Sequence, residues 1–139
     1  MLKKAVLAMI AVFILWSVID YIIHGLMLRS TYEATARLWR PMAEMKTYLF
    51  YIVYAFVAFF FTLIFSKGYE AKGLLEGVRY GLYVALMIVL PHAYNSYATL
   101  QIPYSIALQW FLYGTVEYVL AGAFLSAAFQ MAGDSSTSS

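Results

Sequence analysis

Four long stretches of apolar residues, separated by short polar segments, dominate the hydropathy pattern of this chain. Each is close to the roughly 20 residues that a helix needs to cross a bilayer core. The alternation in steps of two that marks the strands of a membrane barrel is absent, and lipid-exposed backbone has to satisfy its own hydrogen bonds. The pattern therefore predicts an all-α fold, an integral membrane four-helix bundle, with spans at about 5–28, 48–66, 74–100 and 104–131.

The connection between the first two predicted spans, "RSTYEATARLWRPMAEMK", is the longest and most charged. Ser30 or Thr31 could cap a short helix there, and Pro41 would end it. Trp39, Tyr32 and the arginines suit the headgroup layer, so a short interfacial helix is expected, with a loop that binds lipid or a partner as the alternative. Residues 1–132 form one transmembrane domain, and the polar residues 133–139 are expected to be a disordered tail.

Composition strengthens the membrane assignment, because 64% of the 139 residues are hydrophobic and only 12% are charged. The net charge of +2 gives no reason to expect a nucleic-acid partner, and the lack of cysteine excludes disulfides and thiol chemistry. We expect a multi-pass protein of the cell (inner) membrane. We also expect both termini in the cytoplasm, because their side of the membrane carries slightly more cationic side chains than the other. That side has Lys3, Lys4, Lys67, Lys72 and Arg79, and the opposite side has Arg29, Arg37, Arg40 and Lys46.

Small residues recur at intervals of four in the last two predicted spans. Gly73, Gly77 and Gly81 mark one helix face, and Gly114 and Gly122 mark another. Such stripes let two helix backbones approach closely, either within one bundle or between copies in a homo-oligomer. The second span is instead bulky and aromatic ("FVAFFF"), which suits a helix that faces lipid or is covered by a larger membrane complex.

The informative residues are four ionisable side chains inside the predicted spans: Asp20, His24, His92 and Glu117. Such groups are expensive in hydrocarbon and normally face the bundle interior. At 1.5 Å per residue, Asp20, His92 and Glu117 lie roughly 22, 21 and 18 Å from the same membrane face, with His24 one turn beyond Asp20. Asn95 shares a helix face with His92. A polar site between spans one, three and four is therefore predicted.

Several roles fit this cluster. The side chains could only satisfy one another, or they could bind a proton, an ion or a small polar ligand. Asp20, His24, His92 and Glu117 are also a plausible ligand set for a divalent metal, and His24 and His92 could ligate a haem iron. Phosphate-binding loops, HExxH and G-x-S-x-G motifs are absent, so an enzyme is not predicted, although a membrane enzyme built on these residues stays open. The alternative is a non-catalytic accessory subunit of a larger membrane complex.

Four phrases carry a family resemblance: "IDYIIHG", "YEATARLWRPMAEM", "KGYEAKGLLEGVRYG" and "QWFLYGTVEYVLAG". With them the chain resembles an uncharacterised family of small bacterial four-span integral membrane proteins, over nearly its whole length. The resemblance implies the four-span architecture. It implies no activity, ligand or catalytic residue.

Overall fold

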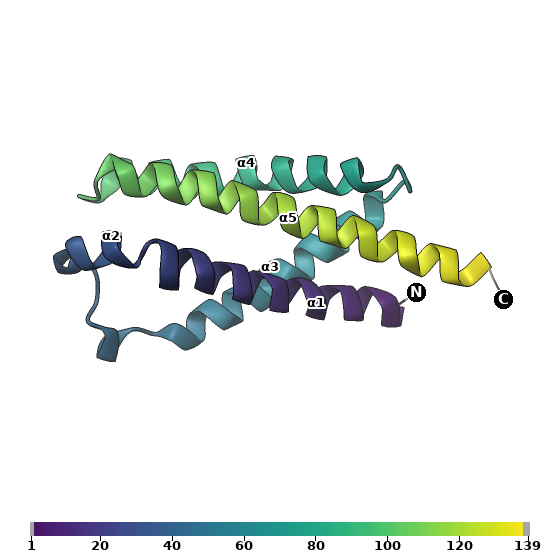
Figure 1. Cartoon of the computed structure of the whole chain (residues 1–139), viewed down its shortest axis with the longest axis horizontal. Helices are drawn as coiled ribbons and strands as arrows, with labels where there is room; N and C mark the ends of the chain where they lie inside the picture. The colour runs from purple at the N-terminus through teal and green to yellow at the C-terminus, as the bar shows by residue number, and fades with distance from the viewer. Residues whose placement is uncertain (1, 138–139) are drawn as a thin grey trace.

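The structure, a computed structural model, describes residues 2–137, with side chains described for residues 5–132. The described chain is helical without strands, as the hydropathy pattern predicts (Figure 1). Its helices are α1 (Leu2–Asp20), a π-helix η1 (Tyr21–Met27), α2 (Arg29–Ala34), the 3-10 turns η2 (Ala36–Leu38) and η3 (Met42–Glu44), α3 (Thr47–Gly68), α4 (Leu74–Thr99) and α5 (Tyr104–Thr137).

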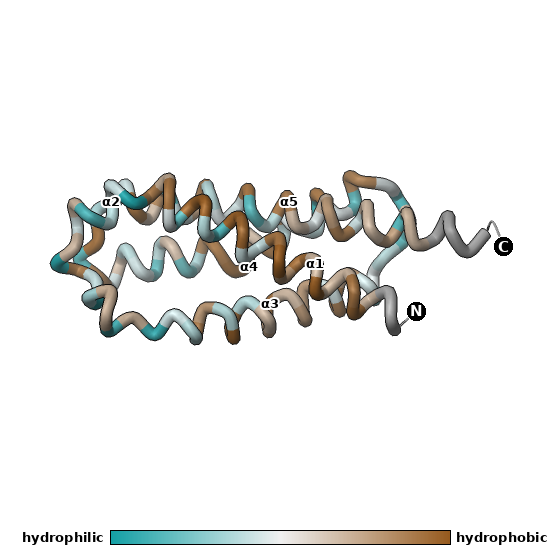
Figure 2. Tube along the Cα trace, turned by 60° about the horizontal axis from the view of Figure 1, so that its bottom comes forward, coloured by the Kyte–Doolittle hydropathy of each residue, from teal (hydrophilic) through white to brown (hydrophobic). Residues whose placement is uncertain are grey.

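Four helical segments are long and apolar enough to cross a membrane, at Ala5–Met27, Thr47–Gly68, Leu74–Thr99 and Tyr104–Ala132. The predicted spans agree with these segments within two residues at every end, so the four-helix architecture is confirmed. Hydrophobic residues dominate the middle of the bundle and hydrophilic ones gather near the connections (Figure 2). The protein is therefore a multi-pass membrane protein by the length and composition of its helices.

The helices pack as an antiparallel hairpin of α4 and α5, with α1 laid against α5 and α3 laid against α1. In Figure 1, α3 crosses the other helices obliquely, and the two marked chain termini lie at the same end of the molecule. The most extensive contact is the one between α4 and α5. By contrast, the first half of α3 diverges from α4, which leaves one side of the bundle open.

Glycines explain the tight α4–α5 contact. Gly77 of α4 and Gly122 of α5 face each other so closely that a Cβ on either would strike the carbonyl oxygen of the other. A Cβ on Gly81 would meet the Tyr118 carbonyl, and one on Gly114 would lie 2.7 Å from a methyl carbon of Val89. These stripes serve contacts within one chain, which was the first of the two predicted alternatives.

Gly73 differs from its predicted place on the helix-packing stripe. It lies before α4 with φ of 86°, a left-handed conformation that glycine adopts without steric cost. Its carbonyl nevertheless reaches α5, because it accepts a hydrogen bond of 3.0 Å from the Ser126 hydroxyl. Gly73 thus allows the chain to turn before α4 begins, and its hydrogen bond holds this turn against α5.

The main core lies where α1, α3 and α5 meet, around Val12, Trp16, Phe61 and Leu125. Trp16 contacts the rings of both Phe61 and Tyr118, with centroids 5.0 Å apart in each pair. Outside this core, large apolar side chains are exposed on every span, including Phe56 at 63% exposure. That surface suits a hydrocarbon solvent.

The connection between α1 and α3 contains the expected short helix, α2, but its ends differ from those predicted. The residue before α2 is Leu28, and the first turn has no side-chain cap, so neither Ser30 nor Thr31 acts as the cap. The helix ends at Ala34, well before Pro41. The disorder predicted for residues 133–139 is not tested, because their side chains are not described and residues 138–139 lie outside the described chain.

Candidate polar site in the membrane-spanning region

The site begins where α1 changes from an α-helix into the π-helix η1, immediately after Asp20. The wider hydrogen-bond pattern is visible in the bond of 2.8 Å from the Leu28 N–H to the Ile23 carbonyl, five residues earlier. Stretches of π-helix are rare and often occur at functional sites. Here the change of winding lies between Asp20 and His24, whose Oδ1 and Nε2 atoms are 3.6 Å apart.

Tyr32 of α2 connects His24 to the opposite wall of the bundle. Its hydroxyl lies 2.5 Å from His24 Nδ1 and accepts a hydrogen bond of 2.7 Å from Trp110 Nε1 on α5. The rings of His24 and Tyr32 are also stacked, with centroids 5.9 Å apart. A residue of the connection therefore joins the first span to the fourth.

This geometry assigns the proton positions. An indole N–H can only donate, so the Tyr32 oxygen accepts from Trp110 and its own O–H is free to donate to His24 Nδ1. Burial raises the pKa of Tyr32 to about 12, so this proton stays in place at neutral pH. The remaining proton of a neutral His24 is then on Nε2, which lies 3.6 Å from Asp20 Oδ1.

The fourth and fifth groups of the cluster come from α3 and α5. Tyr54 of α3 and Glu117 of α5 both lie close enough to Asp20 for an electrostatic interaction with its side chain. Two carboxylates, a histidine and two phenols from α1–η1, α2, α3 and α5 thus form one interacting group. We call it the polar cluster: Asp20, His24, Tyr32, Tyr54 and Glu117.

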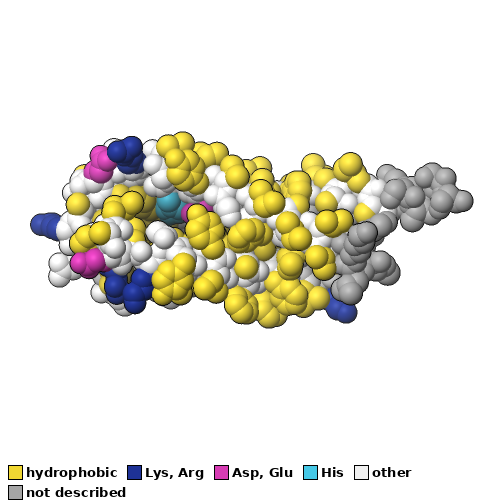
Figure 3. Space-filling model, turned by 90° about the horizontal axis from the view of Figure 1, so that it is seen from below, with side chains coloured by type: hydrophobic (Ala, Val, Ile, Leu, Met, Phe, Trp, Pro, Cys, Tyr) yellow, Lys and Arg dark blue, Asp and Glu magenta, His cyan; other side chains and the backbone are white. Residues whose placement is uncertain are grey.

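His92 lies beside this cluster on α4. It is close enough to His24 for an electrostatic interaction, and its ring stacks on that of Trp110 with centroids 5.3 Å apart. Asn95, predicted to contribute to the site, is exposed on α4 beyond His92. Figure 3 shows a histidine and an acidic side chain together at the bottom of a hollow, near the end of the molecule that carries most of the visible charged groups.

A metal or haem role receives no support from this arrangement. Within residues 2–137, no group of three or more His, Asp or Glu side chains is placed to hold a metal ion. Both ring nitrogens of His24 already face protein groups, the Tyr32 hydroxyl at Nδ1 and the Asp20 carboxylate at Nε2. The arrangement offers instead hydrogen-bond acceptors and groups that take up or release protons.

Sequence reasoning missed Tyr32, Tyr54 and Trp110. Thirteen tyrosines are spread over the chain, and neither a loop tyrosine nor a span tryptophan has a periodicity that marks it as functional. The one available signal was that Tyr32 follows His24 by eight residues, which a continuous helix would place near the same face.

No protein-family model, curated protein or solved structure matches this chain. Its function is therefore argued from the polar cluster itself, and from the elements that hold these side chains within apolar surroundings.

Proposed function

We propose that this chain is a small multi-pass membrane protein that takes up and releases protons at the polar cluster, where a small polar ligand also binds. The observation that carries the proposal is the connected chain of groups from Trp110 through Tyr32 and His24 to Asp20. Ionisable side chains in such a position are costly in a membrane and characteristic of proton relays.

Protonation of His24 changes the hydrogen bonding of the whole chain. An imidazolium donates from both nitrogens, so Nδ1 can no longer accept the Tyr32 hydroxyl proton. That hydroxyl must then find another acceptor, while Asp20 gains a fully charged partner at Nε2. A polar ligand that accepts a hydrogen bond from the Tyr32 hydroxyl would replace the acceptor lost when His24 is protonated. Such a ligand binds the protonated form more tightly, which links proton uptake to ligand binding.

Replacing Asp20 with asparagine should reduce proton flux through the protein by at least about tenfold, because an amide cannot take up the proton that a positioned carboxylate transfers. The measurement is the collapse of an imposed pH gradient in proteoliposomes, followed with an internal pH-sensitive dye and corrected for protein-free vesicles. Glu117→Gln should act in the same direction, since Glu117 interacts with Asp20.

Glu33→Gln is the matched control. It makes the same change from acid to amide at an exposed side chain whose partner is Arg29, at 2.9 Å on α2. Its flux should equal that of the wild type. Equal corrected rates for the wild type and Asp20→Asn, with both proteins folded by circular dichroism, would refute a proton function of the cluster.

A second candidate, an accessory subunit of a larger membrane complex, is favoured by the open aromatic face of α3. Tyr48, Tyr51, Phe56 and Phe59 are all exposed there. Under this alternative the chain co-purifies with a defined partner in mild detergent, and alanine at Phe56 and Phe59 weakens that association. A Leu75→Ala control, at an exposed residue of α4, should leave it unchanged. A chain that always elutes as a lone monomer would contradict this candidate.

A further inference from the structure

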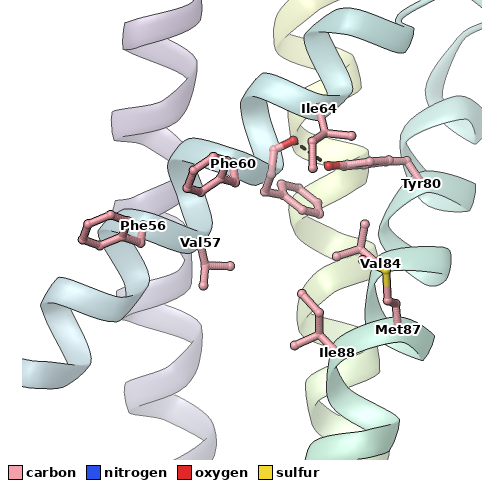
Figure 4. A pocket seen from close by; sticks show the side chains of 9 residues that line it. Phe56, Val57, Phe60, Ile64, Tyr80, Val84, Met87 and Ile88 are labelled. Carbon is pink, nitrogen blue, oxygen red and sulfur yellow. Dashed lines mark hydrogen bonds between the residues drawn. The ribbon is translucent and has the colours of Figure 1, made fainter.

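An apolar groove of about 190 Å³ separates α3 from α4 (Figure 4). Its α3 wall includes Val57, Phe60 and Ile64, and its α4 wall includes Val84 and Ile88. One end is closed where the Tyr80 hydroxyl donates a hydrogen bond of 2.6 Å to the Phe61 carbonyl and the two rings pack with centroids 4.6 Å apart. Away from this end the two helices diverge, as Figure 4 shows.

The two walls lead toward the polar cluster. On α4, Val84, Ile88 and His92 follow one another at intervals of four, so they lie along one side of the helix. On α3, Tyr54, which interacts electrostatically with Asp20, lies three residues before Val57. The groove is therefore apolar at its closed end and bordered by hydrogen-bonding groups at its wide end.

We infer that this groove, together with the polar cluster, binds an amphiphile with a single hydrocarbon tail and a head that donates hydrogen bonds, such as a hydroxyl. The tail lies between α3 and α4, and the head meets Asp20 and Glu117. Both helices are membrane spans, so the groove opens to a solvent made of hydrocarbon chains. The Asp20 carboxylate only accepts hydrogen bonds, so it favours a donating head and repels an anionic one.

Binding of such an amphiphile names the class of ligand for the proposed function. It rests on that function for the location of the head at the polar cluster. The tail is an independent element, because it depends on the groove and not on protonation. Filling the groove should therefore remove tail binding while leaving proton flux intact, and Asp20→Asn should stop flux without closing the groove.

The test is a titration of the whole protein in phosphatidylcholine vesicles with 12-bromododecan-1-ol, whose terminal bromine quenches nearby tryptophan. Phe61 lines the groove and contacts Trp16, so a bound tail carries the bromine toward that indole. We expect a saturable decrease in fluorescence above the linear quenching caused by partition into the bilayer. The carboxylate counterpart, 12-bromododecanoate, should bind about tenfold more weakly because its charged head is repelled by the Asp20 carboxylate.

Ile88→Phe and Val57→Phe place extra volume in the groove from opposite walls. Each should weaken saturable binding by about tenfold, equivalent to losing roughly two buried methylene groups. Leu120→Phe is the control, since this exposed residue of α5 does not line the groove. Quenching that is linear in the wild type would overturn the inference, and so would saturable quenching with the wild-type affinity in both groove variants. If flux is lost in Asp20→Asn under either outcome, the proposed function survives the failure of this one.

Discussion

Replacing Gly122 with alanine should destabilise the protein by about 3 kcal/mol, the upper end of the usual cost of overpacking. The added methyl group would strike the Gly77 carbonyl and lie 3.0 Å from the backbone nitrogen of Gly81. Both obstacles are backbone atoms of α4, so no side chain can rotate away, and the two helices must separate. The measurement is unfolding of the purified protein in a titration from mild detergent into a denaturing one.

Gly68→Ala is the control for this substitution. Gly68 is the last residue of α3, and a Cβ there would meet no atom within 4 Å. Its stability should equal that of the wild type or exceed it slightly, because alanine restricts the unfolded chain. A Gly122→Ala protein as stable as Gly68→Ala would show that the α4–α5 contact is looser than described.

Replacing Tyr32 with phenylalanine should cost about 2 kcal/mol, because it leaves two polar partners with no replacement. The Trp110 N–H loses its acceptor, and His24 Nδ1 loses its donor. The ring itself remains, with its stacking on His24 and its edge contact to Trp39, so the loss comes from the hydroxyl alone. Denaturation in detergent gives the free energy, and nitrogen NMR of labelled histidine reports whether Nδ1 has become protonated.

Tyr83→Phe removes a hydroxyl from an exposed tyrosine of α4 and should change stability by less than about 0.5 kcal/mol. With only two histidines in the chain, a His92→Gln variant assigns the His24 signals. A neutral His24 that carries its proton on Nδ1 in the wild type would contradict the proton positions assigned to the cluster, whatever the stability of Tyr32→Phe.

The span architecture could be predicted from the sequence because hydropathy and length are sums over many residues. Single errors at span ends therefore matter little, and all four spans agree with the structure. The ends of α2 were predicted less well, because capping depends on one residue and Leu28 is already fixed by the bond of its N–H to Ile23 within the π-helix. The π-helix itself left no periodic signal.

Part of the polar cluster was also accessible to sequence reasoning. Asp20 and His24 share a helix face by their spacing, and depth counting placed Glu117 near Asp20, with which it interacts. What spacing could not supply was the contribution of the connection, because Tyr32 lies on α2, beyond a π-helix whose winding departs from the 3.6-residue period. Contacts between segments distant in sequence, such as Tyr32 with Trp110, have no local pattern.

The close hairpin of α4 and α5 has a consequence for biogenesis. Only residues 100–103 separate these helices, and their backbones meet through glycines without help from α1 or α3. Helices α4 and α5 can therefore pack against each other as soon as both have left the ribosome and entered the bilayer. Until then, α3 packs against α1 alone and its aromatic face contacts lipid. We therefore expect the polar cluster, which takes residues from both halves, to be completed last, when the hairpin packs against α1 and α3.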